Sequence, residues 1–234
     1  DIPSGIDPDT GNIFDFSIRA NRTVTFIFPK TGIISYPGRE YAGDITVNSL
    51  NIPLKIISDF VNNNRLSLKS YMTDFDFVAD NIETRKMNSY KNLFGKVAFL
   101  GGSSGMAGAV CISAMSAVKS GAGLVYMTVP EEILAICLKT IPEALITSDY
   151  CKVFDLPDVL AIGPGLDESD SKAIEIIKTA IENFPKLILD AGALNIISRD
   201  IPYFIELFKK RKDKGLPYTI LTPHHGEIKR MLVG

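Results

Sequence analysis

The sequence predicts an α/β fold: an open, mostly parallel sheet with helices on both faces, preceded by a β-rich segment. From Lys96 onward, short apolar strands alternate with amphipathic helices, the pattern of parallel sheets built from strand–helix–strand units. Before residue 54, β-branched and aromatic runs stand between turn residues, and no long helix is visible. Glycine-rich or polar segments follow several of the later strands, where an open parallel sheet binds its ligands.

The composition is that of a globular protein with a sizeable core. Of the 234 residues, 46% are hydrophobic and 22% are charged, and the formal net charge is -2. Such a chain is not built to neutralise nucleic-acid phosphates, so we expect no nucleic-acid partner. It contains no run of about 18 apolar residues, so we expect no membrane span, and its first residues lack the pattern of a signal peptide.

The three cysteines favour a reducing compartment. Cys111, Cys137 and Cys151 include no C-x-x-C pair, which argues against a disulfide framework or a zinc site, and we expect a cytoplasmic protein. Cys111 and Cys137 fall in apolar helical patterns and are expected to pack in the core. The sequence begins at Asp1 without a methionine and stops at Gly234 soon after a helix begins, so we expect both ends to be cuts through a longer protein.

Two strands are predicted in residues 1–53, which we expect to form one domain. The run 23–28 is β-branched and aromatic and ends before Pro29, and 44–47 is a second candidate strand. Residues 54–84 are expected to be a junction, with a polar patch at 62–65.

A second domain is expected from residue 85 to residue 234. Its strands and helices are predicted from apolar runs and from helical periodicity. The predicted strands are 96–100, 124–129, 159–162, 187–189 and 218–221, and the predicted helices are 106–119, 131–139, 169–183 and 202–212, with another beginning near Glu227.

A basic run, Lys209 to Lys214, closes the helix predicted at 202–212. Cations are favourable at a helix C-terminus because of the helix dipole. We therefore expect these side chains, Arg211 among them, to be solvated rather than to form a nucleic-acid surface.

Four loops at the carboxyl ends of the predicted strands are the candidate ligand sites: 101–108, 163–166, 190–195 and 222–227. The loop 101–109 is rich in glycine and serine but lacks the Walker A and G-x-G-x-x-G patterns, so a plain strand-to-helix turn is an equally good interpretation. Asp190 can be an ordinary helix N-cap. His224 and His225, the only histidines, do not make a metal site by themselves.

Taken in order, the segments after residue 85 resemble the ADP-dependent NAD(P)H-hydrate dehydratases, which have a ribokinase-like fold. The chain departs from that pattern at Tyr90-Lys91-Asn92, where the family usually has His-Lys-Gly, and at His225, where proline is common. The segments that carry the resemblance are 88–95, 101–109, 120–125, 163–166, 190–195 and 221–227.

The first segment is similar to the tail of the NAD(P)H-hydrate epimerases, a β-rich tail of a Rossmann-like domain that is fused in front of the dehydratase in many bacteria and archaea. The residues that carry this similarity are 1–7, Thr10-Gly11, 23–26, Lys30, Gly38, Gly43-Asp44 and Ile52-Pro53.

The resemblance implies a metabolite-repair enzyme acting on NAD(P)H hydrate with an adenine nucleotide. The dehydratase phosphorylates the hydrate's hydroxyl with ADP, or possibly ATP in this chain, together with Mg2+, and phosphate elimination restores NAD(P)H. The epimerase interconverts the two hydrate epimers and uses K+. We also expect a homo-oligomer.

The site residues follow from the same resemblance. Ala109, Gly165 and His224 match positions that bind the hydrate in the dehydratases. Asp1 matches a hydrate-binding position of the epimerases, and Ser4 matches a potassium ligand, a role that a hydroxyl oxygen can fill. The dehydratase's catalytic Asp and nucleotide-binding segments are expected beyond Gly234.

Two other interpretations stay open. A ribokinase-like kinase acting on a vitamin precursor or sugar would show similar segments, and the domain could be a binding module without turnover. A plain doubly wound domain, whose loops only turn corners, is the least specific interpretation.

Overall fold

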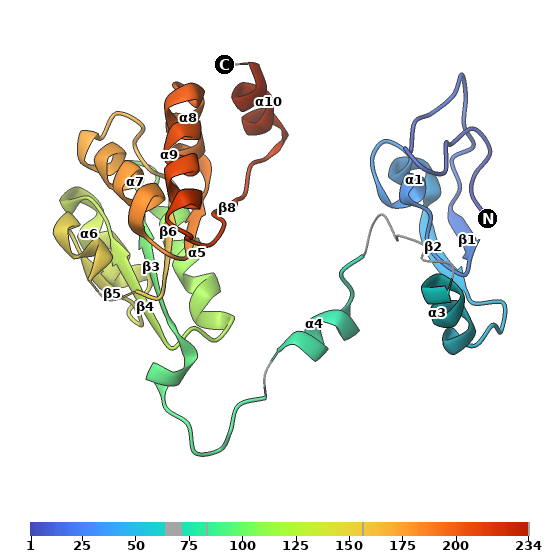
Figure 1. Cartoon of the computed structure of the whole chain (residues 1–234), viewed down its shortest axis with the longest axis horizontal. Helices are drawn as coiled ribbons and strands as arrows, with labels where there is room; N and C mark the ends of the chain where they lie inside the picture. The colour runs from blue at the N-terminus through green and yellow to red at the C-terminus, as the bar shows by residue number, and fades with distance from the viewer. Residues whose placement is uncertain (64–71, 83, 156, 234) are drawn as a thin grey trace. The chain divides into compact units, whose positions relative to one another are not determined.

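The computed structural model of the chain describes residues 1–63, 72–82, 84–155 and 157–233. The chain divides into two compact units, residues 1–84 and residues 85–234 (Figure 1). Within the polar patch predicted at 62–65, Asn64 and Arg65 lie outside the described residues.

The first unit is built on two parallel strands. Arg22 pairs with Asp44 and Phe26 with Asn48, so β1 and β2 run in register along their whole length. The small core beside them consists of Ile6, Ile33 and Ala42. The elements of this unit are β1 (Arg22–Phe26), α1 (Thr31–Ile34), α2 (Arg39–Ala42), β2 (Asp44–Asn48), α3 (Leu54–Asn63) and α4 (Phe75–Asn81).

The second unit contains a six-stranded sheet in the order β5-β4-β3-β6-β7-β8. Every neighbouring pair of these strands is parallel, which confirms the predicted fold class. The strands are β3 (Lys96–Leu100), β4 (Leu124–Thr128), β5 (Leu145–Thr147), β6 (Val159–Ile162), β7 (Leu187–Leu189) and β8 (Ile220–Leu221). The helices are α5 (Ala107–Lys119), α6 (Glu131–Thr140), α7 (Ser171–Asn183), α8 (Ala191–Ser198), α9 (Ile201–Asp213) and α10 (His225–Val233), with 3-10 turns η1 (Lys91–Phe94) and η2 (Tyr150–Phe154).

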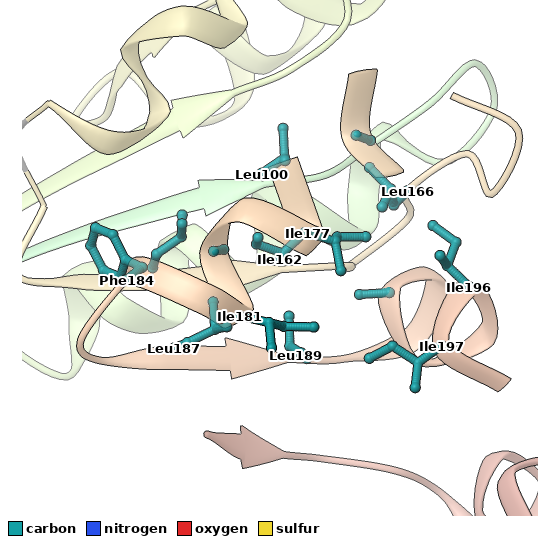
Figure 2. Close-up of a cluster of buried hydrophobic side chains, with 14 of the residues drawn as sticks. Leu100, Ile162, Leu166, Ile177, Ile181, Phe184, Leu187, Leu189, Ile196 and Ile197 are labelled. Carbon is teal, nitrogen blue, oxygen red and sulfur yellow. The ribbon is translucent and has the colours of Figure 1, made fainter. Parts of the chain in front are cut away.

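Alternation along the strands separates two cores, one on each face of this sheet. Successive side chains of a strand point to opposite faces. Leu160 and Ile162 of β6 therefore pack with α7, α8 and α9, whereas Ala161, between them, packs with α5 and α6. Figure 2 shows Ile177 and Ile181 of α7 beside the strand residues of the first of these cores.

Arg211 contradicts the prediction that the basic run is solvated. Its side chain is 3% exposed, and its guanidinium donates four hydrogen bonds to backbone carbonyls of 2.6 to 3.1 Å. Burial lowers the pKa of this guanidinium from its ordinary value. The acceptors are the carbonyls of Ile181, Phe184, Pro185 and Pro217.

Two further observations complete the fold. Cys111 and Cys137 are buried and unpaired, as the apolar helical pattern predicts. Among the described residues, no helix has both the length and the apolar character needed to cross a membrane.

Candidate functional site

Hydrogen bonds fasten the loop after β3 to the loop after β6. The N–H of Gly102 donates to the carbonyl of Pro164 at 2.8 Å. The buried Ser103 donates its hydroxyl to the carbonyl of Gly165 at 2.9 Å. Two loops that are about 60 residues apart in the sequence thus form one surface at the carboxyl end of the sheet, where such sheets bind ligands.

Gly165 lies directly against the first turn of α5. Its φ of +66° is in the left-handed region, and a Cβ at this position would lie 2.5 Å from the carbonyl oxygen of Met106 and 3.1 Å from the Cβ of Ala109. Only glycine fits this backbone and this space. Two of the residues predicted to bind the hydrate, Ala109 and Gly165, are therefore in contact, and Ala109 is exposed.

A cavity of about 960 Å³ opens beside this surface. Residues that follow β3, β4, β5 and β6 line it, so it lies at the carboxyl ends of four neighbouring strands out of six. Its volume is in the range of small-molecule sites. The lining residues are Ser103, Ser104, Met106, Pro130, Glu131, Glu132, Ser148, Tyr150, Leu166, Asp167, Glu168, Asp170, Ser171 and Lys172.

Two hydrogen bonds join polar side chains of the cavity wall. Glu131 accepts a hydrogen bond from the Ser148 hydroxyl, and the Tyr150 hydroxyl donates to Asp170 at 2.9 Å. Burial, and then the Asp170 carboxylate, raise the pKa of Tyr150 well above its ordinary value, so this tyrosine stays a neutral donor. These hydrogen bonds connect the segments after β4 and β6 to the residues that follow β5.

Asp190 stands at the end of β7 and precedes α8, but its carboxylate does not cap that helix. Instead it accepts a hydrogen bond of 2.8 Å from the hydroxyl of Thr222, which follows β8. Asp190 therefore occupies the N-cap position of α8, as predicted, but its side chain makes no capping hydrogen bond to the helix. This contact ties the loop after β7 to the loop that carries His224.

His224 precedes α10 and is held by that helix. Its backbone N–H donates to Oε2 of Glu227 at 2.8 Å, while its Nδ1 accepts from the N–H of Gly226 at 2.9 Å. Nε2 lies 3.4 Å from Oε1 of Glu227, whose side chain is 7% exposed. An Nδ1 that accepts a hydrogen bond places the proton of a neutral imidazole on Nε2. The His224 side chain is 66% exposed and can meet a ligand.

The predicted residues of the second unit are thus not gathered at one point. Ala109 and Gly165 touch at the loops after β3 and β6, whereas His224 follows β8, two strands further along the sheet. Sequence reasoning missed Glu168 and Tyr150 as members of the cavity wall. Their partners are between 20 and 31 residues away in the sequence, so no local pattern reveals them.

Within the first unit, Asp1 is fixed at the end of β1. Its Oδ1 accepts hydrogen bonds from the Thr25 hydroxyl at 2.7 Å, the Phe26 N–H at 3.1 Å and the Lys30 ammonium at 2.8 Å. Thr25 is fully buried, so the carboxylate has a rigid support. The carboxylate itself is 46% exposed, and it can receive a polar ligand.

Ser4 offers a single hydroxyl oxygen for a cation. Its side chain is exposed, while its carbonyl already accepts hydrogen bonds from Ile18 N–H and from the Ser17 hydroxyl, both at 3.0 Å. Within residues 1–63, 72–82, 84–155 and 157–233, no group of three or more His, Cys, Asp or Glu could hold a metal ion. Ser4 therefore fits a hard cation only as one ligand among several.

Sequence comparison finds two families along the chain. The profile of the NAD(P)H-hydrate dehydratases matches residues 97–233, more than half of the chain, and the profile of the YjeF-related protein N-terminus matches residues 1–32. Bifunctional NAD(P)H-hydrate repair enzymes from Moorella thermoacetica and Dictyoglomus turgidum are 33% and 30% identical, each over 99% of this chain. The chain covers 44% and 45% of those relatives, so it spans about half of their length.

Solved structures agree with the sequence comparison. A ribokinase-like superfamily protein from Enterococcus faecalis superposes with a TM-score of 0.56 at 25% identity, covering 70% of this chain and 59% of the other. An ADP/ATP-dependent NAD(P)H-hydrate dehydratase from Bacillus subtilis, co-crystallized with ATP and Mg2+, superposes with a TM-score of 0.51 at 29% identity. That match covers 67% of this chain and 53% of the Bacillus protein.

Proposed function

Because the chain belongs to the NAD(P)H-hydrate dehydratase family, we propose that it supplies the hydrate-binding loops of an enzyme that returns NAD(P)H hydrate to NAD(P)H. The observation that carries this proposal is the contact between Gly165 and Ala109, which joins the loops after β3 and β6 into one exposed surface. Both residues match hydrate-binding positions of the family, and the match covers the whole ordered set of loops along the sheet edge.

The proposed reaction has two steps. The hydroxyl group of the hydrate attacks the terminal phosphoryl group of the nucleotide, and the shortened nucleotide leaves. The phosphate then departs from the nicotinamide ring together with a ring proton, and the dihydronicotinamide double bond is restored. As in other phosphoryl transfers, the protein's contribution is mainly position and charge stabilisation.

The chain's own residues bind and orient the hydrate in this scheme. The small residues Ala109 and Gly165 let the ligand approach the backbone closely, and the buried Ser103 keeps the two loops together. The exposed side chain of His224 is held in orientation by Gly226 and Glu227, and its Nε2 lies 3.4 Å from Oε1 of Glu227. The imidazole can donate a hydrogen bond to an oxygen of the hydrate.

The nucleotide and Mg2+ are proposed from the Bacillus relative, which was co-crystallized with ATP and Mg2+. When bound, the ion would offset negative charge on the phosphates. The described part of the chain contains no group of three or more His, Cys, Asp or Glu that could hold a metal ion, and no residue is assigned to Mg2+. Phosphate release measured with ADP and with ATP decides which nucleotide donates the phosphoryl group.

We also propose that residues 1–53 belong to an epimerase-like domain, 54–84 to a junction and 85–234 to the dehydratase-like domain. The two family matches, at residues 1–32 and 97–233, support this order of parts. In the first domain, the carboxylate of Asp1 would bind the hydrate, and the Ser4 hydroxyl would be one ligand of K+.

The unpaired cysteines support a reducing, cytoplasmic setting. We also propose a homo-oligomer, which light scattering would test.

Selective phosphate release tests the proposal. The full-length gene product that carries this sequence is incubated with ADP or ATP, Mg2+ and either NADH hydrate, a sugar or a vitamin precursor alcohol. We expect phosphate only with the hydrate. Stable phosphorylation of another alcohol would instead establish a kinase, and binding without turnover of any of these compounds would establish a binding module.

A further inference from the structure

A line of side-chain hydrogen bonds passes through Asn195 on α8. The Asn195 amide donates through Nδ2 to Oε1 of Glu168 at 2.6 Å. On its other side, Oδ1 accepts from Nε and Nη2 of Arg230 at 3.2 and 2.8 Å. One half-buried amide thus joins a carboxylate to a guanidinium, and hydrogen bonds to charged groups are stronger than neutral ones.

The carboxylate end of this line belongs to the cavity wall. Glu168 lines the cavity and follows β6, three residues after Gly165. Arg199 holds it further, with an ion pair to Oε2 and a hydrogen bond of 3.0 Å to the backbone carbonyl of Glu168. The wall is thereby tied to α8 at two points.

The guanidinium end belongs to the helix that follows His224. A Cβ built on Gly226 would lie 2.9 Å from Cε1 of His224 and 3.7 Å from Nη1 of Arg230. Both side chains thus lie within 4 Å of the same point beside Gly226. His224 is hydrogen-bonded to Gly226 and Glu227 of α10, and Arg230 belongs to the same helix, so α10 carries both the support of the imidazole and the partner of Asn195.

We propose that Asn195 is a positioning residue for His224, linking the cavity wall to the first turn of α10. The inference rests on the proposed function, because His224 is assigned to the hydrate there. The amide satisfies both neighbours, because its Nδ2 donates to Glu168 while its Oδ1 accepts from Arg230. The buried apolar residues of α8, Leu194 and Ile197 among them, anchor the helix without Asn195.

An exchange of donor and acceptor tests the link. Asn195→Asp keeps the acceptor for Arg230 but places a carboxylate against Glu168. Adding Glu168→Gln reverses the hydrogen bond, so that Gln donates to Asp, and leaves an oxygen for Arg199. Arg230→Met is a second variant, which removes the hydrogen bonds at the α10 end. The Arg230 side chain is exposed, so we expect this variant to fold.

Three quantities are measured on the 234-residue chain: the unfolding midpoint, the ring NMR signals of His224 without ligand, and the dissociation constant for NADH hydrate. The chain has two histidines, so His225→Gln assigns the signals. We expect Asn195→Asp and Arg230→Met to move the His224 signals and to weaken hydrate binding about tenfold. The double variant Asn195→Asp/Glu168→Gln should recover both.

The outcomes separate the inference from the function on which it rests. A lower unfolding midpoint with unchanged His224 signals and unchanged hydrate binding would show that Asn195 only stabilises the fold, and would overturn the proposal. Shifted His224 signals in a chain that never binds hydrate would support the positioning link and refute the proposed function. If Asn195→Asp does not fold, Arg230→Met decides by the same readouts.

Discussion

Arg211 is a charged residue in the interior of the unit 85–234, with only 3% of its surface exposed. Its four hydrogen bonds go to the end of α7, to the residues after it and to Pro217 ahead of β8. A guanidinium has five N–H donors in a fixed plane, which suits several carbonyls at once. Arg211 therefore anchors the segment that leads into β8, and through it the loop with His224.

Replacing Arg211 by methionine should lower the free energy of unfolding by about 3 kcal/mol, because four carbonyls, two of them on buried residues, lose the charged donor that they share. Arg211→Lys should cost less, since an ammonium still reaches one or two of these oxygens. Urea unfolding followed by circular dichroism measures both. Equal stability of Arg211→Met and the parent chain would contradict this role.

His224 should matter for the hydrate and little for the fold. Its side chain is exposed, and its contacts are local to α10. We expect His224→Ala to weaken hydrate binding about tenfold, the value of one well-placed hydrogen bond, with an unfolding midpoint close to that of the parent. His225→Ala, at the neighbouring exposed position, is the control and should bind hydrate normally. If His224→Ala and His225→Ala bind the hydrate with the same dissociation constant, His224 does not contribute to hydrate binding.

At the scale of elements, the junction of the loops after β3 and β6 depends on backbone contact at Gly165. Gly165→Ala should destabilise the chain by about 3 kcal/mol, combining left-handed backbone strain with overpacking against Met106. Gly215 has a similar φ of +69° but open space around it, so Gly215→Ala carries strain alone and should cost about 1 kcal/mol. The difference between the two losses of stability, measured by urea unfolding, gives the cost of overpacking residue 165 against Met106. Equal losses would show that the loops are not locked there.

The strands were predictable where the sheet buries them. β3, β4, β6 and β7 are apolar runs bounded by turn residues, and each lies within a residue or two of its predicted limits. β5 was not predicted: its three residues, Leu145–Thr147, lie at the edge of the sheet and none of them is buried. The helix α8 was anticipated only by the N-cap interpretation of Asp190, without bounds.

The site was predictable only in part, for a related reason. Glycine and histidine at strand ends are visible as local sequence features, and the family resemblance names Ala109, Gly165 and His224. The partners of Asn195 are 27 and 35 residues away, and three of the four acceptors of Arg211 are 26 to 30 residues away. No periodicity or turn chemistry encodes such contacts, and only the packed sheet brings them together.

At the scale of the whole chain, the two units differ in the size of their cores. The second unit has two clusters with 19 and 12 buried residues, whereas the described part of the first has one cluster of three beside a two-stranded sheet. Such a sheet is marginal by itself. We therefore expect residues 85–234 to fold when expressed alone and residues 1–84 not to. Circular dichroism and amide NMR spectra of the two pieces check this, and an unfolded 85–234 would contradict it.

The recovery of NADH from its hydrate tests the central claim most directly. The full-length gene product is mixed with NADH hydrate, ADP and Mg2+, and the absorbance of the dihydronicotinamide ring is followed with time. The account predicts that absorbance returns only when the nucleotide is present and that His224→Ala slows the return while His225→Ala does not. Absorbance that never returns, from a protein that is folded and binds nucleotide, would contradict the assignment to hydrate repair.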